Sequence, residues 1–222
     1  MSKSVSRDNS ILERVSARER KAIFAVIQEV VMRPGQLICR AGTRVKHVYF
    51  PRRGVISLFA VGKDGPDVGV GMVREDGMFG LCVAVGHSKS HLLAVAQGAG
   101  EAYRIESSAF LGVLGGCPSL QGALFTYSQS ISDQMARNVL CVARHPAKTR
   151  LARWMLDVTA GSNGSSFCST QETTATSLGL QRPAISYAAS ALQRLGLIRY
   201  LRGEVTILNR KGLRAVACNC SG

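Results

Sequence analysis

The spacing of hydrophobic positions changes several times along this chain of 222 residues, and each change marks a new part of the fold. Near the start, Ser16 and Glu19 fit a capping box, which predicts a first helix. We expect Ile23, Val26 and Ile27 to form the apolar stripe of this helix. A proline–glycine turn then ends the helical part.

From that turn to about residue 106, the pattern changes to short β-rich runs separated by turn clusters. The clearest runs are residues 47–50, 55–59 and 92–96. Several short strands at close and regular spacing are typical of an antiparallel β-roll or sandwich. We therefore expect residues 16–117 to form a β-roll of the double-stranded, jelly-roll type, in a protein of the α+β class.

Residues 118–145 return to a helical period and predict one long helix that ends at His145-Pro146. Its recurring hydrophobic positions are Leu120, Leu124, Tyr127, Ile131, Met135 and Val139. Two interpretations are open at this point. The helix packs on its own roll, or the stripe is the seam of a coiled-coil-like dimer.

The last part, residues 146–217, contains two further helical patterns joined by a tight turn. Ser169 and Glu172 fit a second capping box, and Gly179 supplies a sharp turn after the helix that this box starts. Pro183 then falls in the first turn of the next helix, where proline is tolerated. Two helices with this connection predict a helix-turn-helix.

The helix that begins near Pro183 has two distinct faces. Its apolar face contains Ile185, Ala188, Ala189, Leu192 and Leu195, at spacings of three and four residues. Polar side chains gather elsewhere in its N-terminal half, the part that a recognition helix inserts into the major groove of DNA. An ordinary helical hairpin in an enzyme core would show the same two-helix pattern, so the segment that follows decides between the two.

That segment consists of two short β-rich runs, residues 198–201 and 204–207, around Arg202-Gly203. Such a basic hairpin after a helix-turn-helix is typical of a winged helix that binds DNA. We predict that the DNA-binding residues are Thr170, Gln181, Arg182, Ala184, Ser186, Tyr187, Ser190, Arg199 and Arg202. Because winged-helix DNA readers commonly use two-fold symmetry, we favour the dimer seam for the long helix.

Charge agrees with this prediction. The chain has 28 Lys and Arg against 14 Asp and Glu, a formal net charge of +14. From Arg144 onward there are 11 basic and 3 acidic residues, against 17 and 11 before it. The excess of positive charge is therefore greatest, for its length, where binding to phosphates requires it. No Ser-His-Asp order, carboxylate dyad, HExxH or phosphate loop stands out, so we do not expect an enzyme.

The seven cysteines are scattered and odd in number, which is typical of reduced thiols. Only Cys218 and Cys220 lie close together, and without the spacing of a zinc knuckle we interpret them as incidental, with redox sensing as the alternative. We predict no metal and no other cofactor. The sequence has no apolar run of membrane-spanning length and no signal-peptide core, so we expect a cytoplasmic protein without a membrane partner.

The order of β-roll, long helix and winged helix resembles the Crp/Fnr family of bacterial transcription regulators, over about residues 20–215. The most specific matching segments are RRGVIS at 52–57, RLARW at 150–154, LGLQRP at 178–183 and LQRLGLI at 192–198. The resemblance implies a homodimer on a roughly palindromic promoter site, with RNA polymerase as a further partner. It also implies that Arg182 reads a guanine, because the family places a base-reading arginine there. Pro183 and Tyr187 depart from the acidic residue and second arginine that are usual in the family.

The roll of this family often binds a cyclic nucleotide through a glutamate on the ribose and an arginine on the phosphate. In the matching segment, residues 77–100 contain neither Glu nor Arg, and Leu81 stands at the glutamate position. We therefore expect no tight binding of cyclic AMP, and a roll that senses an unknown effector or none. The expected effector pocket consists of Gly80, Leu81, Cys82, Lys89 and His91. The iron–sulfur branch of the family is not expected, because no cysteine precedes Cys39.

A second hypothesis is an effector-sensing module whose partner is a protein and whose DNA binding is vestigial. Thr173 and Thr174 favour it, because they stand where this helix usually carries apolar residues. A hydroxyl group buried without a hydrogen bond destabilises the fold, so this departure keeps the second hypothesis open.

Overall fold

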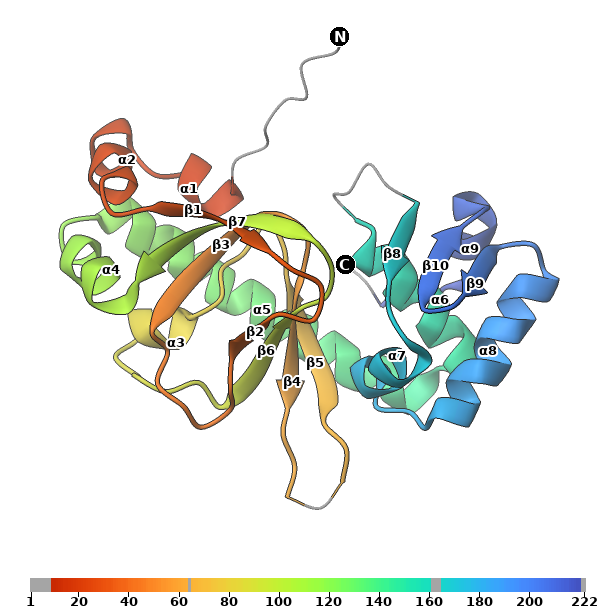
Figure 1. The fold of residues 1–222 in the computed structure, drawn as a ribbon. Helices are drawn as coiled ribbons and strands as arrows, with labels where there is room; N and C mark the ends of the chain where they lie inside the picture. The colour runs from red at the N-terminus through yellow and green to blue at the C-terminus, as the bar shows by residue number, and fades with distance from the viewer. Residues whose placement is uncertain (1–8, 64, 161–164, 221–222) are drawn as a thin grey trace, which may run out of the picture.

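The computed structural model describes residues 9–63, 65–160 and 165–220. In this part of the chain, one hydrophobic core lies in an N-terminal β-roll and another in a C-terminal unit. The long helix α5 (Pro118–Arg144) runs from the first to the second (Figure 1). The expectation that the chain has no signal peptide was based on its polar N-terminus, and most of that segment lies outside the described residues.

The roll consists of two antiparallel sheets. One contains, in spatial order, β1 (Gln28–Met32), β7 (Gly100–Glu106) and β3 (His47–Arg53). The other contains β2 (Leu37–Cys39), β6 (Leu92–Ala96), β4 (Ile56–Ala60) and β5 (Val68–Val73). The predicted α+β class with an antiparallel roll is confirmed. Strand β1 was not predicted, because only Met32 among its five residues is buried and its sequence shows no alternation.

Within the described residues, four short helices cover the roll. They are α1 (Ser10–Glu13), α2 (Ala17–Phe24), α3 (Leu81–Ala84) and α4 (Ser107–Leu114). The hydroxyl of Ser16 caps α2 by accepting a hydrogen bond from the Glu19 amide, as predicted. The helix ends earlier than its apolar stripe suggested, since Val26 and Ile27 lie beyond it and pack on the core. Residues of α1 also belong to this core, so the roll includes residues that precede position 16.

The predicted long helix is present as α5, but its hydrophobic stripe has a different role from the one expected. Leu120, Leu124 and Tyr127 are buried in the core of the roll, and Ile131 and Met135 pack against that core. Of the six residues predicted as a dimer seam, Val139 is the exposed one, at 70%. The prediction is therefore corrected: the other five positions are apolar because they cover the roll of their own chain.

The C-terminal unit has the element order of a winged helix. Its elements are α6 (Ala147–Val158), β8 (Ser166–Cys168), α7 (Gln171–Leu178), α8 (Arg182–Arg194), β9 (Ile198–Leu201), β10 (Glu204–Ile207) and α9 (Arg210–Val216). The strands form one antiparallel sheet in the order β8-β10-β9. Leu151, Ile185 and Leu192 are fully buried between α6 and α8. The division into residues 16–117, 118–145 and 146–217 stays a prediction.

Polar contacts join the C-terminal unit to the roll and to α5. The Arg74 guanidinium donates a hydrogen bond to the Asp157 carbonyl at 3.2 Å. On α5, Asn138 donates to the Val70 carbonyl at 2.9 Å and accepts from Arg153 at 2.8 Å. These contacts hold α6 beside α5. Within the described residues, no single helix is long and apolar enough to cross a membrane, although α4 and α5, bent by 114°, pass the same test as a pair.

Candidate nucleic-acid interface

Local sequence signals position α7 and the turn after it. The N-cap of α7 is Thr170, whose hydroxyl accepts a hydrogen bond from the Thr173 amide at 3.0 Å. The predicted capping box at Ser169 and Glu172 is therefore displaced by one residue, because the Ser169 side chain is buried and turned inward. At the other end, Gly179 adopts φ 57° and closes the helix with a Schellman motif.

The buried face of α8 fixes which side chains the helix presents to the outside. Ile185, Ala188, Ala189 and Leu192 are buried, as the periodicity predicted. Leu195 is 56% exposed, contrary to the prediction, because the helix ends at Arg194 and Leu197 is buried instead. With this face turned inward, the N-terminal half of α8 projects its polar residues away from the core.

The predicted recognition residues lie on that outer side. Gln181, Arg182 and Tyr187 are exposed, and Tyr187 reaches 79% exposure. Ala184, Ser186 and Ser190 are half-buried. Figure 1 shows α8 on the side of the C-terminal unit that faces away from the roll. The geometry therefore leaves the N-terminal half of this helix accessible, while the role of each side chain stays a prediction.

The wing forms a two-residue hairpin with the predicted strand bounds. Leu201 pairs with Glu204, and the turn residues Arg202 and Gly203 have φ values of 51° and 81°. Positive φ at both positions is the geometry of a type I′ turn, which is strained for an arginine. The turn exposes Arg202, and Arg199 is exposed on β9. Both arginines of the wing are therefore accessible.

A network of hydroxyl groups fixes the start of α7 to the wing. The Ser169 amide donates to the Gly203 carbonyl at 2.8 Å, which brings Thr170 next to the wing turn. The Tyr200 hydroxyl donates to the Ser169 carbonyl at 2.7 Å, and burial raises the pKa of Tyr200. The fully buried Thr174 donates to the Thr170 carbonyl at 2.9 Å. Its hydroxyl is thus satisfied, so Thr174 no longer supports the hypothesis of vestigial DNA binding.

Arg150 is a positioning residue that the sequence analysis missed. Its guanidinium donates to the Leu178 carbonyl at the C-terminal end of α7, where a positive charge is favourable. Burial lowers the pKa of this group. The matching segment RLARW contains Arg150, but a single charge on an otherwise apolar helix face gives no local sign that it is buried.

Solved structures share this architecture. FixK2 from Bradyrhizobium japonicum is 18% identical, with 87% of this chain and 98% of that chain covered at a TM-score of 0.70. A Crp/Fnr-family transcriptional regulator from Thermus thermophilus is 21% identical, with 85% and 97% covered at a TM-score of 0.69. At sequence identities this low, the structural similarity establishes a shared fold alone. Among curated proteins, none matches the sequence significantly.

Sequence families identify both units of the chain. Residues 29–116 match the cyclic nucleotide-binding domain, and residues 149–216 match the Crp-like helix-turn-helix domain. The chain belongs to the Crp/Fnr family of transcription regulators. This Crp/Fnr regulator is a DNA-binding protein and not an enzyme, in agreement with the prediction.

None of the five residues of the regulator's expected effector pocket lines either of two cavities that lie among the described residues. Gly80 adopts φ 96° before α3, and Leu81 and Cys82 are partly buried against the core of the roll. Burial raises the pKa of Cys82. Lys89 and His91 are exposed in the loop that leads to β6. A cavity of about 210 Å³ lies nearby, but it is lined by residues 37–40, 43–47 and Phe79. Whether any of the five residues binds an effector stays a prediction.

A larger cleft separates the C-terminal unit from the roll and α5. Its volume is about 860 Å³, and Arg74, Tyr127, Gln134 and Trp154 are among its lining residues. Gln134 accepts a hydrogen bond from the Met72 amide at 2.7 Å, so this side chain fastens α5 to β5. The sequence analysis missed this cleft, because the residues around it come from seven separate stretches of the chain.

The structure also gathers three cysteines at this cleft. Cys141 on α5 lies beside Cys218 and Cys220, and their sulfur atoms lie within 4.8 Å of one another. Burial raises the pKa of Cys141 to about 12. The interpretation of Cys218 and Cys220 as an incidental pair is therefore revised. A third thiol that is distant in sequence completes the group, and no spacing motif could have shown it.

Proposed function

We propose that this Crp/Fnr regulator acts as a homodimer on a two-fold symmetric promoter site, with α8 in the major groove. The observation that carries the proposal is the exposed, polar N-terminal half of α8, which lies on the outer side of the winged helix. In this arrangement Arg182 makes a bidentate contact to a guanine. Gln181, Ala184, Ser186, Tyr187 and Ser190 line the same groove. Thr170, Arg199 and Arg202 contact the phosphates on either side.

A second copy of the chain is the proposed partner of α5. On the side of α5 opposite the roll, exposed residues recur at spacings of three and four, the heptad pattern of a two-helix seam. This exposed seam consists of Gly122, Phe125, Gln129, Ser132, Ala136, Val139 and Ala143. Phe125 is 83% exposed, which is unusual for an aromatic side chain without a partner. The seam replaces the stripe that the sequence analysis proposed.

The remaining partners follow from this role. We propose that the regulator contacts RNA polymerase in the cytoplasm, where the promoter DNA is, and that its roll responds to an effector other than cyclic AMP. The segment at residues 77–100 supports this, because it offers neither the glutamate nor the arginine that would hold the ribose and the phosphate.

The test is selection of bound sequences from random duplex DNA at about 150 mM salt, which suppresses non-specific phosphate binding. We expect a two-fold symmetric site with half-sites about one helical turn apart. Arg182→Ala should cost about 1–3 kcal/mol and relax preference at one position of each half-site. Arg194→Ala, in the last turn of the same helix, is the matched control and should retain that preference.

A variant of the wing distinguishes contacts to DNA phosphates from contacts to bases. Arg202→Ala should weaken binding about equally on all sequences and reduce the salt slope by about 1. Selection of no common sequence, or an unchanged site preference in Arg182→Ala, would contradict the proposed role of α8.

A further inference from the structure

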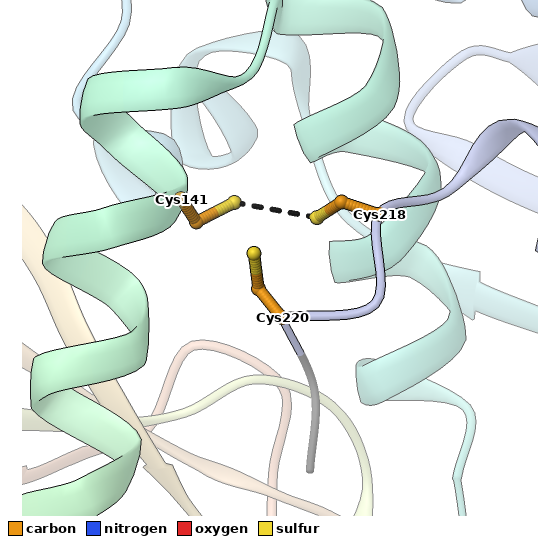
Figure 2. A group of neighbouring side chains, drawn as sticks. All are labelled: Cys141, Cys218 and Cys220. Carbon is orange, nitrogen blue, oxygen red and sulfur yellow. Dashed lines mark hydrogen bonds between the residues drawn. The ribbon is translucent and has the colours of Figure 1, made fainter.

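Three cysteines from two distant segments point toward one spot at the junction of α5 and the C-terminal unit. Cys141 lies near the end of α5, and Cys218 and Cys220 lie on the tail that follows α9. Figure 2 shows their sulfur atoms facing one another between the helix and the tail. The sulfur atoms of Cys141 and Cys218 are 3.5 Å apart, and all three lie within 4.8 Å.

These distances fit three ligands of one metal ion. Two thiolates on a tetrahedral zinc ion, each about 2.3 Å from the metal, are about 3.8 Å apart. The separation between Cys141 and Cys218 is close to this value, and Cys220 needs to move inward by no more than about 1 Å to match it. Cys141 is buried and the two tail cysteines are half-buried, so water is partly excluded from the site.

Two guanidinium groups lie near the three thiols, whereas burial raises the pKa of Cys141 and Cys220. Arg153 lies within electrostatic reach of all three thiols, and Arg150 lies within reach of Cys141 and Cys218. A bound cation displaces the thiol protons and, together with the two guanidinium groups, offsets the negative charge of the thiolates. The Asp157 carboxylate, which pairs with Arg153, adds one negative charge nearby. Cys141 and Cys220 also line the large cleft, which provides a route for an ion to enter.

We propose that Cys141, Cys218 and Cys220 bind a thiophilic d¹⁰ cation, Zn²⁺ or Cu⁺. Thiolate-rich sites select these ions over the hard cations that prefer oxygen. The cation links α5 to the tail of the winged helix and thereby fixes the orientation of α8 relative to the roll. Binding of the ion therefore changes the affinity for DNA. This second consequence rests on the proposed function, whereas the metal site does not.

The first experiment measures metal binding by the full-length, reduced protein. Zn²⁺ and Cu⁺ are supplied separately, in competition with a chromophoric chelator, and Co²⁺ serves as a spectroscopic probe of thiolate ligands. We expect about one ion per chain, with charge-transfer absorption from sulfur to cobalt. Cys218→Ser and Cys220→Ser should each weaken binding more than the roughly 10- to 100-fold that loss of a residue supporting the ligands costs.

Cys168→Ser is the matched control, because Cys168 is an exposed cysteine on β8. It should bind the ion as the unaltered protein does. The metal site is refuted if the tail variants bind ions as tightly as this control. It is also refuted if the unaltered protein retains no ion and instead loses two thiols to a disulfide in air.

The second experiment measures affinity for the selected DNA site with the ion and with a chelator. We expect a difference of about 5- to 150-fold, the usual range for coupling between two sites, and no difference in Cys220→Ser. Equal DNA affinities with the ion and with the chelator refute the coupling. Failure to bind any DNA in either state, with the ion bound, refutes the proposed function and leaves the metal site standing.

Discussion

Single residues decide how closely the roll and the winged helix approach each other. Gly69 on β5 faces the backbone of α7, and a methyl group at this position would overlap the Ser177 carbonyl. Backbone atoms cannot move aside as a flexible side chain can, so only glycine allows this approach. The contact between β5 and α7 therefore depends on the absence of one side chain.

We predict that Gly69→Ala separates α7 from β5 without unfolding either unit. Alanine is otherwise tolerated in a strand, so the steric clash affects only the contact between β5 and α7. Hydrogen–deuterium exchange should rise in α7 and β5, while the core strands of the roll keep their protection. Gly62→Ala, where the added methyl group meets open space, is the control. Equal exchange in the two variants would show that the contact does not depend on Gly69.

At the scale of elements, the long helix α5 obtains its N-terminal cap from another helix. Cys117, its N-cap residue, makes no side-chain hydrogen bond to the helix. Instead, the Glu19 carboxylate of α2 accepts hydrogen bonds from the Ser119 and Leu120 amides, each at 3.3 Å. The Ser119 hydroxyl also donates to it and lowers the pKa of Glu19. The negative charge stands at the positive end of the helix dipole, where it is stabilising.

We predict that Glu19→Gln lowers stability at pH 7 and makes it less dependent on pH. A pKa that is lower in the folded state contributes stability above the unfolded pKa, and this contribution disappears as pH falls through the folded value. The difference between the two proteins should therefore shrink in acid, below about pH 4. Urea unfolding between about pH 3 and pH 7 measures this difference in the free energy of unfolding. Glu13→Gln, on the exposed side of α1, is the control, and a difference that stays constant with pH would contradict the capping role.

At the scale of the whole molecule, the two sides of α5 have different roles. Leu124 is 4% exposed and belongs to the core of the roll, whereas the next residue, Phe125, is 83% exposed on the proposed seam. One side of the helix therefore stabilises the chain on which it lies. The other side is available to a second copy.

We predict that substitutions at these two neighbours have different effects. Leu124→Ala should lower the free energy of unfolding by about 2–5 kcal/mol through the cavity that it leaves, and the protein should remain a dimer below its unfolding transition. Phe125→Ala should shift the protein toward monomers in sedimentation experiments. Its unfolding should be compared at one protein concentration, because dimer stability depends on concentration. A fully dimeric Phe125→Ala would mean that the seam lies elsewhere.

The local patterns of the sequence determined the elements that carry the function. Periodicity, proline and turn residues sufficed for α5, β6, both wing strands and the pair α7 and α8, because each of these signals acts over a few neighbouring residues. The polar face of α8 followed from the same periodicity once its buried face was assigned. The cap of α7 was misplaced by one residue, because Ser169 and Thr170 are equally suitable caps and only packing decides which of them turns inward.

Only the tertiary structure decided which residues distant in sequence meet. Glu19 reaches Ser119, Arg150 reaches Leu178, and Cys141 reaches Cys218, and in each case the two partners belong to different elements. The hydrophobic stripe on α5 is a further case in which the local sequence pattern does not identify the packing partner. Its period predicts a buried face, but it does not say whether the roll or a second copy buries it. A hydrophobic pattern shows which side chains are removed from water, because burial of apolar surface is favourable. Only the folded chain shows which residues they pack against.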